Sequence, residues 1–78
     1  MNTRTFKKIL ISKESMVDKF NKLAKAKFDS LSEEKTDKYQ MRTYWLNKRP
    51  AYKYYKYASG SCYLHDFVNQ VNYQYIPA

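Results

Sequence analysis

The first third of the chain combines a short apolar run with a longer amphipathic segment. Residues 5–11 hold β-branched and partly alternating apolar positions, which fit a short strand, although they also fit the front of a longer helix. A strand followed by a helix is favoured, because Ser15 and Asp18 form a capping box just before the strongest helical pattern. We therefore predict a helix over residues 15–28. Its apolar face consists of Met16, Val17, Phe20, Leu23, Ala24 and Phe28.

The middle of the chain carries a second set of helix signals. Ser30 and Glu33 form another capping box, and a helix over residues 32–47 is predicted to follow. Asn47 suits a left-handed C-terminal cap, and the residue before Pro50 is disfavoured in a helix. Because the connection to the preceding helix is very short, the two helices are expected to pack as a helix hairpin.

The last third contains one ambiguous segment and one clearer one. Residues 50–58 alternate like a strand rich in tyrosine. Pro50 in a first helical turn and Gly60 just past the C-terminus would also suit a helix. Both readings stay open. A helix is predicted over residues 62–72, with an extended tail over residues 73–76. The apolar positions that indicate this helix are Leu64, Phe67, Val68, Val71 and Tyr75.

These segments together predict an α+β fold dominated by helices. It would consist of the helix hairpin and the C-terminal helix with a short β-ribbon, and an all-α small bundle is the alternative. The 78 residues of the chain correspond to a single small domain, residues 1–78, near the size at which one hydrophobic core becomes marginal.

Composition narrows the chemistry that the chain can support. One Cys allows no internal disulfide, one His with one Cys makes no closed zinc site, and one Gly makes no glycine-rich phosphate loop. We expect no metal and no cofactor. No apolar run reaches the roughly 20 residues that span a bilayer, and the N-terminus lacks the features of a signal peptide. The expected location is therefore intracellular, in the cytoplasm, or in the host cytoplasm for a viral protein.

The net charge of +8 is spread unevenly, and the densest positive stretch is residues 48–57. Residues 48–57 hold four cations, four tyrosines and no acid. Lysine and arginine neutralise phosphates, while tyrosine rings stack on unpaired bases, so this mixture is typical of a surface that binds nucleic acid. The alternative for each tyrosine is a place in the core. The candidate binding residues of this segment are Lys48, Arg49, Tyr52, Lys53, Tyr55, Lys56 and Tyr57.

The predicted helix over residues 32–47 is neutral overall but segregates its charges. Lys35, Lys38 and Arg42 follow i, i+3, i+7 spacing and would form one basic stripe edged by aromatic residues. Long basic stems that merely cover an apolar face are the alternative. If the stripe and residues 48–57 face the same way, they form one continuous basic patch.

These observations favour a small nucleic-acid-binding protein, with RNA or single strands preferred over duplex DNA because stacking on tyrosine needs unpaired bases. The alternative is a charge-steered inhibitor or adaptor, phage-encoded for example, that binds an acidic surface of a host factor or of a toxin–RNA system. We expect no enzymatic activity, because nothing accompanies Cys62 and His65 that would make them a catalytic dyad. No membrane partner is expected, and a homodimer would help so small a core.

Overall fold

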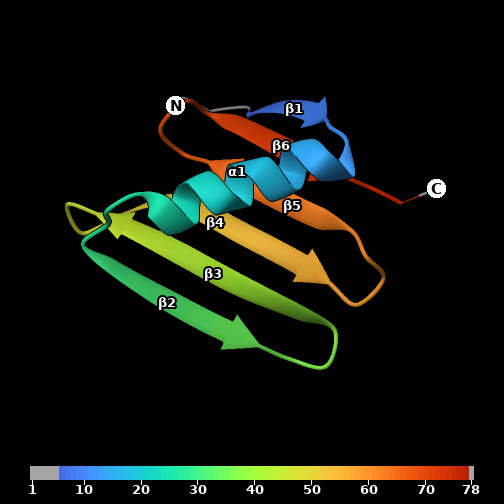
Figure 1. Cartoon of the computed structure of the whole chain (residues 1–78). Helices are drawn as coiled ribbons and strands as arrows, with labels where there is room; N and C mark the ends of the chain where they lie inside the picture. Colours follow the sequence, from blue (N-terminus) through green and yellow to red (C-terminus); the bar gives the residue numbers. More distant parts are fainter. Residues whose placement is uncertain (1–5, 78) are drawn as a thin grey trace, which may run out of the picture.

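The fold is a six-stranded mixed sheet with one helix across one of its faces (Figure 1). A computed structural model describes residues 6–77. The elements in chain order are β1 (Lys7–Leu10), α1 (Lys13–Lys25), β2 (Ser30–Lys35), β3 (Tyr39–Leu46), β4 (Arg49–Tyr57), β5 (Cys62–Asp66) and β6 (Val71–Tyr75). Strands account for 51% and the helix for 18% of residues 6–77, so the helix-dominated α+β prediction and its all-α alternative are both wrong.

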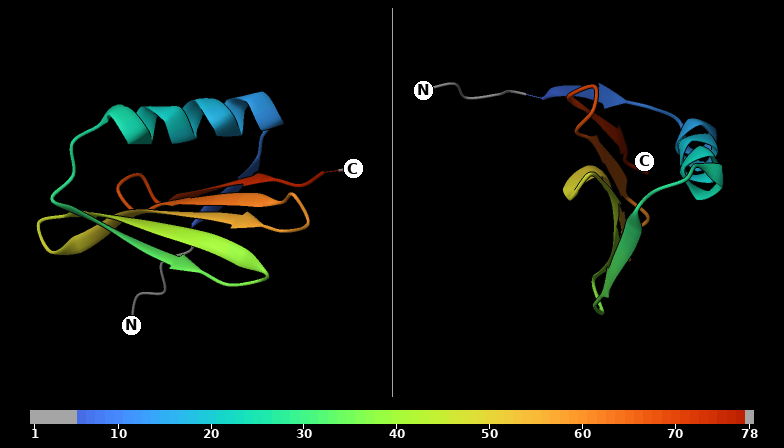
Figure 2. Two further views of the ribbon diagram at one scale, coloured as in Figure 1. Left: turned by 60° about the horizontal axis from the view of Figure 1, so that its bottom comes forward. Right: turned by 90° about the vertical axis from the view of Figure 1, so that its left-hand side faces the viewer.

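Five strands form an antiparallel meander, and the first strand closes the sheet at the far edge. The order across the sheet is β1-β6-β5-β4-β3-β2, with β1 parallel to β6 and all other neighbours antiparallel. The chain therefore starts at one edge, crosses by α1 to the opposite edge, and returns strand by strand until β6 lies beside β1 (Figure 2). This path brings the two ends of the described chain onto neighbouring strands.

The predicted helix over residues 32–47 is replaced by β2, a turn and β3. Thr36 makes the turn, because its hydroxyl oxygen accepts hydrogen bonds from the backbone N–H groups of Lys38 and Tyr39, each at 3.2 Å. The segment after the turn is rich in aromatic and β-branched residues, which favour strands. The capping-box spacing of Ser30 and Glu33 thus falls within a strand, and no helix hairpin forms.

The predicted C-terminal helix is likewise a hairpin, formed by β5 and β6. Asp66 holds its turn, since the carboxylate accepts hydrogen bonds from the backbone and side-chain N–H groups of Asn69, both at 2.9 Å. The helical spacing of the apolar residues is therefore coincidental. The sequence leaves helix and strand open for residues 50–58, and the structure places most of them in β4. The expected extended tail over residues 73–76 corresponds to most of β6.

The first third of the chain folds as the sequence predicts, with shifted boundaries. A strand precedes the helix, which begins at Lys13 instead of at residue 15. Its N-cap is Ser12, whose side chain accepts a hydrogen bond from the backbone N–H of Ser15 at 3.1 Å. Asp18 and Lys22 form an i, i+4 ion pair at 3.2 Å on the exposed side of the helix.

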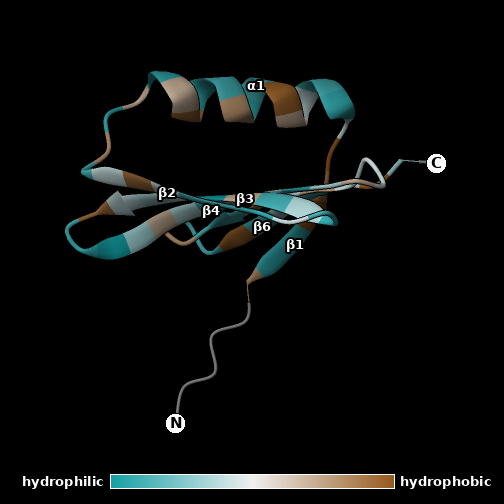
Figure 3. Ribbon diagram, turned by 90° about the horizontal axis from the view of Figure 1, so that it is seen from below, coloured by the Kyte–Doolittle hydropathy of each residue, from teal (hydrophilic) through white to brown (hydrophobic). Residues whose placement is uncertain are grey.

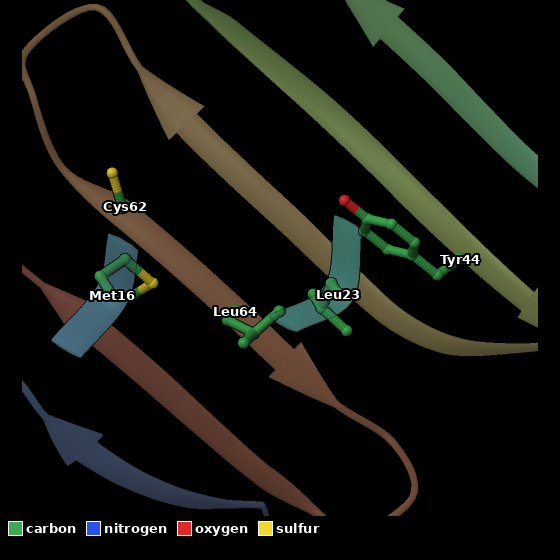
Figure 4. Close-up of a cluster of buried hydrophobic side chains, with 5 residues drawn as sticks. All are labelled: Met16, Leu23, Tyr44, Cys62 and Leu64. Carbon is green, nitrogen blue, oxygen red and sulfur yellow. The ribbon is translucent and has the colours of Figure 1, made fainter. Parts of the chain in front are cut away.

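The core lies between α1 and the sheet (Figure 4). Met16 is 1% exposed and Leu23 is 8% exposed on the helix, and they face Leu64, Tyr44 and Cys62 of the sheet. Partly buried aromatic residues extend this layer. These residues are Phe28, Tyr52, Tyr54, Tyr73 and Tyr75.

The opposite face of the sheet is open. Figure 3 shows α1 on one side of the sheet, and within residues 6–77 no helix or strand covers the other side. A single helix of 13 residues can shield only one face of six strands. Among the described residues, no helix has the length and apolar character needed to cross a membrane.

Candidate nucleic-acid interface

The open face of the sheet carries a continuous row of aromatic rings. Side chains alternate between the two faces of a strand, so every second residue of β3, β4 and β5 points away from α1. Neighbouring ring centroids in the row lie between 5.3 and 6.5 Å apart. We call this set the aromatic row, and it consists of Phe6, Tyr39, Tyr55, Tyr57, Tyr63, His65 and Phe67.

The rings support one another and remain accessible. Tyr55 contacts Tyr39 at 6.1 Å, Tyr57 at 6.3 Å and the ring of His65 at 5.3 Å. Most members are half-buried, because each is covered at its sides by neighbours and uncovered above the sheet. Burial raises the pKa of the Tyr55 hydroxyl above its ordinary value of 10.0, with smaller effects from Tyr57 and Glu34. The Tyr55 ring is therefore neutral at pH 7 and lies among rings that contact one another.

Basic and polar groups run across the sheet beside the rings. Cross-strand pairing places Lys53 opposite His65, His65 opposite Asn72, and Asn72 opposite Lys8. This line puts one lysine near the centre of the open face and another on its β1 edge. On β2 the open face carries Glu34, whose carboxylate accepts a hydrogen bond from the Tyr39 hydroxyl.

His65 sits where the aromatic row meets this polar line. Its pKa is lowered from 6.5, chiefly because half-burial disfavours the charged ring. The neighbouring Asn72 side chain opposes that effect, while the charge of Lys53 adds to it. The imidazole is therefore predominantly neutral at pH 7 and can act as an aromatic surface with hydrogen-bonding edges.

The structure divides the predicted site residues among several places. Lys53, Tyr55 and Tyr57 share the open face, as their spacing in β4 requires. Tyr52 points to the helix side and packs on Phe28, with ring centroids 5.9 Å apart. The core alternative therefore describes Tyr52, and the binding-surface hypothesis retains Tyr55 and Tyr57.

Lys35, Lys38 and Arg42 do not form the predicted basic stripe. Arg42 lies on the helix side, where it pairs with Glu33 at 3.3 Å and covers the ring of Phe20 at 5.2 Å. Lys35 and Lys56 also lie on that side, in register with Gln40 between them. The expectation of a single continuous patch is therefore wrong, because strand alternation separates these cations from Tyr55 and Tyr57.

The remaining predicted cations occupy opposite ends of the sheet. Lys38 lies in the turn between β2 and β3, whereas Lys48 and Arg49 lie at the turn between β3 and β4. The intervening strand has 8 residues. At a rise of about 3.4 Å per residue, the two turns are roughly 25 Å apart. Both turns border the open face, so these cations flank it at its two ends.

Sequence reasoning missed five of the seven members of the aromatic row, namely Phe6, Tyr39, Tyr63, His65 and Phe67. Tyr39 and Tyr63 lie outside the densest basic segment, and Phe6 and Phe67 were assigned to other elements. The available signal was the alternation of Lys53, Tyr55 and Tyr57, which a strand would place on one face. Had β4 been assigned as a strand, its partners would still have required the register of β3 and β5.

Cys62 and His65 do not form a catalytic pair. Cys62 faces the core and His65 faces the open side, because residues three apart in a strand point to opposite faces. Over residues 6–77, no three His, Cys, Asp or Glu side chains gather as a group that could hold a metal ion.

The described residues thus form a mostly β structure, a mixed sheet with one face covered by a helix and one open aromatic face. Comparison with protein-family models, with curated proteins and with solved structures gives no match.

Proposed function

We propose that the protein binds single-stranded nucleic acid, RNA or DNA, on the open face of its sheet. The observation that carries this proposal is the aromatic row, a set of supported rings on a face that no described element covers. Base–aromatic stacking contributes about 1–3 kcal/mol per base and requires unpaired bases, which favours single strands over duplexes.

The charge distribution supports a polyanionic ligand. Lys53 and Lys8 border the rings on the open face, and Lys38, Lys48 and Arg49 flank it at the turns. A strand whose bases lie on the rings would have its phosphates within reach of these side chains. The net charge of +8 adds long-range attraction for such a ligand.

A binding titration at several salt concentrations tests the proposal. Fluorescence anisotropy would compare a labelled single-stranded RNA, the same sequence as single-stranded DNA, and the corresponding duplex. We expect both single strands to bind more tightly than the duplex, with an affinity that falls as salt rises. Duplex binding as tight as that of the single strands, or an affinity independent of salt, contradicts the proposal.

A matched pair of lysine variants localises the phosphate contacts. Lys53→Gln removes a cation from the open face, and Lys22→Gln removes one from α1, where it pairs with Asp18. The log–log salt slope for a single strand should decrease by about 0.7 for each phosphate that the protein no longer neutralises. We expect that change for Lys53→Gln and none for Lys22→Gln. Equal slopes for the two variants would show that the phosphates do not bind at the open face.

Self-association through the open face is the main competing outcome. Sedimentation velocity of the free protein would detect it, and a dimer that loosens in Tyr55→Val but not in Lys22→Gln would assign the rings to an interface between copies. An acidic protein partner would instead leave the protein without single-strand affinity at low salt. Either result would replace nucleic acid as the ligand of this face.

A further inference from the structure

A pocket lies on the helix side of the sheet, away from the aromatic row. It has a volume of about 320 Å³ and is enclosed by the first turns of α1, the turn between β4 and β5, and the segment after β6. Cavities of this size are at the lower end of the range that holds small molecules. The sheet itself separates the pocket from the open face.

The walls of the pocket combine positive charge with apolar surface. Lys13 enters from α1 and Lys56 from β4, while Met16, Val17 and Pro77 supply apolar surface. Among the described residues that line it, none is acidic. Neither lysine forms an ion pair with another described residue, so both charges are available to a ligand.

Hydroxyl and thiol groups also line the pocket. The hydroxyl of Tyr54 contacts the thiol of Cys62 at 3.6 Å, and that thiol in turn donates to the carbonyl oxygen of Gly60 at 3.7 Å. Tyr75 and Ser59 also line the pocket and add hydroxyl groups that can donate to an anion.

The shape of the pocket is built into the backbone. Gly60 has φ +98°, a conformation that glycine adopts readily, and a Cβ atom at this position would lie 3.2 Å from Pro77 Cγ. The turn therefore packs closely against the segment after β6, and this contact forms one end of the pocket.

A second hollow continues the pocket along α1. It has a volume of about 220 Å³ and shares Val17, Tyr54 and Lys56 with the first. Phe20 and Arg42 line its far side. A ligand anchored between the two lysines thus has apolar and aromatic surface along which its body can extend.

We propose that this pocket binds a small organic anion, a carboxylate or phosphate group carried on an apolar body. The anionic group would lie between Lys13 and Lys56, and the apolar body would contact Met16, Val17 and Phe20. The site is independent of the proposed function, because it uses the opposite face of the sheet.

Titrations followed by NMR chemical shifts test this site. Phenyl phosphate and phenylacetate would be added separately, with phenylacetamide as the neutral analogue and inorganic phosphate as the anion without an apolar body. For ligands of this size, dissociation constants of about 1 mM are expected. Gly60 is the one glycine of the chain, so its amide is a convenient reporter.

We expect saturable shifts of the Gly60 amide with one or both aryl anions. The aryl anion that binds with the lower dissociation constant identifies the preferred anionic group. Phenylacetamide and inorganic phosphate should each bind at least about tenfold more weakly, since the first lacks the charge and the second lacks the apolar body. No saturable shift with either aryl anion, or equal binding of phenylacetamide, overturns the proposal.

Two pairs of variants place the ligand. Lys13→Gln combined with Lys56→Gln should weaken the aryl anions about tenfold or more. The control, Lys22→Gln combined with Lys25→Gln, removes the same charge from exposed positions that do not line the pocket and should leave binding unchanged. Equal losses of affinity in the two double variants would indicate general attraction to a cationic protein and overturn the assigned site.

A third measurement separates this site from the open face. Tyr55→Val removes a ring from the aromatic row and should leave aryl-anion binding unchanged. An excess of single-stranded RNA should not displace the aryl anion. If this variant or the RNA abolishes the shifts at Gly60, the aryl anions bind at the open face and the pocket proposal fails, whatever the outcome for nucleic acid.

Discussion

Replacement of Tyr55 by valine removes the central ring of the open face and keeps a residue that favours strands. Tyr55 lies in the middle of β4 and contacts three other rings, those of Tyr39, Tyr57 and His65. Its removal therefore deletes one stacking surface and loosens the neighbours that hold the others. The backbone pairing with Met41 and Tyr63 is unaffected by the side chain.

The expected loss of affinity follows from the energy of stacking. One base on one ring is worth about 1–3 kcal/mol, and 1.4 kcal/mol is a factor of ten in affinity. Tyr55→Val should therefore weaken single-strand binding by about 5- to 150-fold. It should also cost stability, because each aromatic pair that it removes contributes about 0.5–1.5 kcal/mol beyond the buried area.

Tyr52→Val is the matched control. It makes the same change three residues earlier in the same strand, but Tyr52 packs against Phe28 on the helix side. This variant should lose stability and keep its affinity for single strands. Thermal melting followed by circular dichroism would fix a temperature at which both variants are folded, and anisotropy titrations at that temperature would give the affinities.

Two results would refute the reasoning about the open face. Unchanged affinity in Tyr55→Val means that bases do not stack on the aromatic row. An equal loss of affinity in folded Tyr52→Val means that binding depends on the helix side or on general integrity of the sheet. Only a loss confined to Tyr55→Val agrees with the geometry.

Three further predictions concern the fold that supports the site. Lys48→Gly should raise the thermal midpoint of unfolding by a few degrees, because Asn47 and Lys48 both have positive φ in a two-residue hairpin turn. The left-handed conformation costs a residue with a side chain about 1–2 kcal/mol. The control Lys56→Gly, in an extended strand, should lower the thermal midpoint. Leu64→Ala, at a position 3% exposed, should lower the free energy of unfolding by about 2–5 kcal/mol in urea titrations, and a loss well below 1 kcal/mol would contradict the assigned core. The free energy of unfolding should fall as the pH drops below about 6.5 toward the lowered folded pKa of His65, because the unfolded chain then binds more protons. Urea titrations should show a flatter pH dependence of this free energy for His65→Gln.

The sequence predicts the first third of the fold because its signals agree with one another. A polar cap precedes a helix whose apolar residues repeat with helical spacing, and that face becomes the core through Met16 and Leu23. Local propensity, capping and tertiary packing all favour the same structure there. Even so, the cap is Ser12 and not Ser15, since both serines lie near the helix start and only backbone geometry distinguishes them.

The helices predicted for the rest of the chain are wrong because charges and aromatic residues there repeat by chance with helical spacing. Lys35, Lys38 and Arg42 are three and four residues apart, yet a turn at Thr36 separates the first from the last. In such segments the outcome is decided by cross-strand pairing with distant residues. That pairing cannot be read from a window of ten residues, which is why β2, β3 and β5 are predicted wrongly and β6 only as an extended tail.

The candidate site is predicted in part for the same reason. Composition alone identifies the segment that combines lysine and tyrosine, because composition does not depend on secondary structure. The assignment of Tyr52 and Tyr55 to opposite faces does depend on it. Asn47 illustrates the distinction well: its left-handed conformation is expected from its residue type, but it serves a hairpin turn and not the end of a helix.

The distribution of tyrosines bears on why one face of the sheet remains open. Five of the nine pack with the core on the helix side, and four lie on the open face. In a neutral protein, an exposed platform of rings would promote self-association. At a net charge of +8, two copies of this chain repel each other, while phosphates are attracted to the same surface. The combination of uncovered rings with a strongly positive chain therefore favours a polyanion with unpaired bases over a second copy as the ligand of the open face.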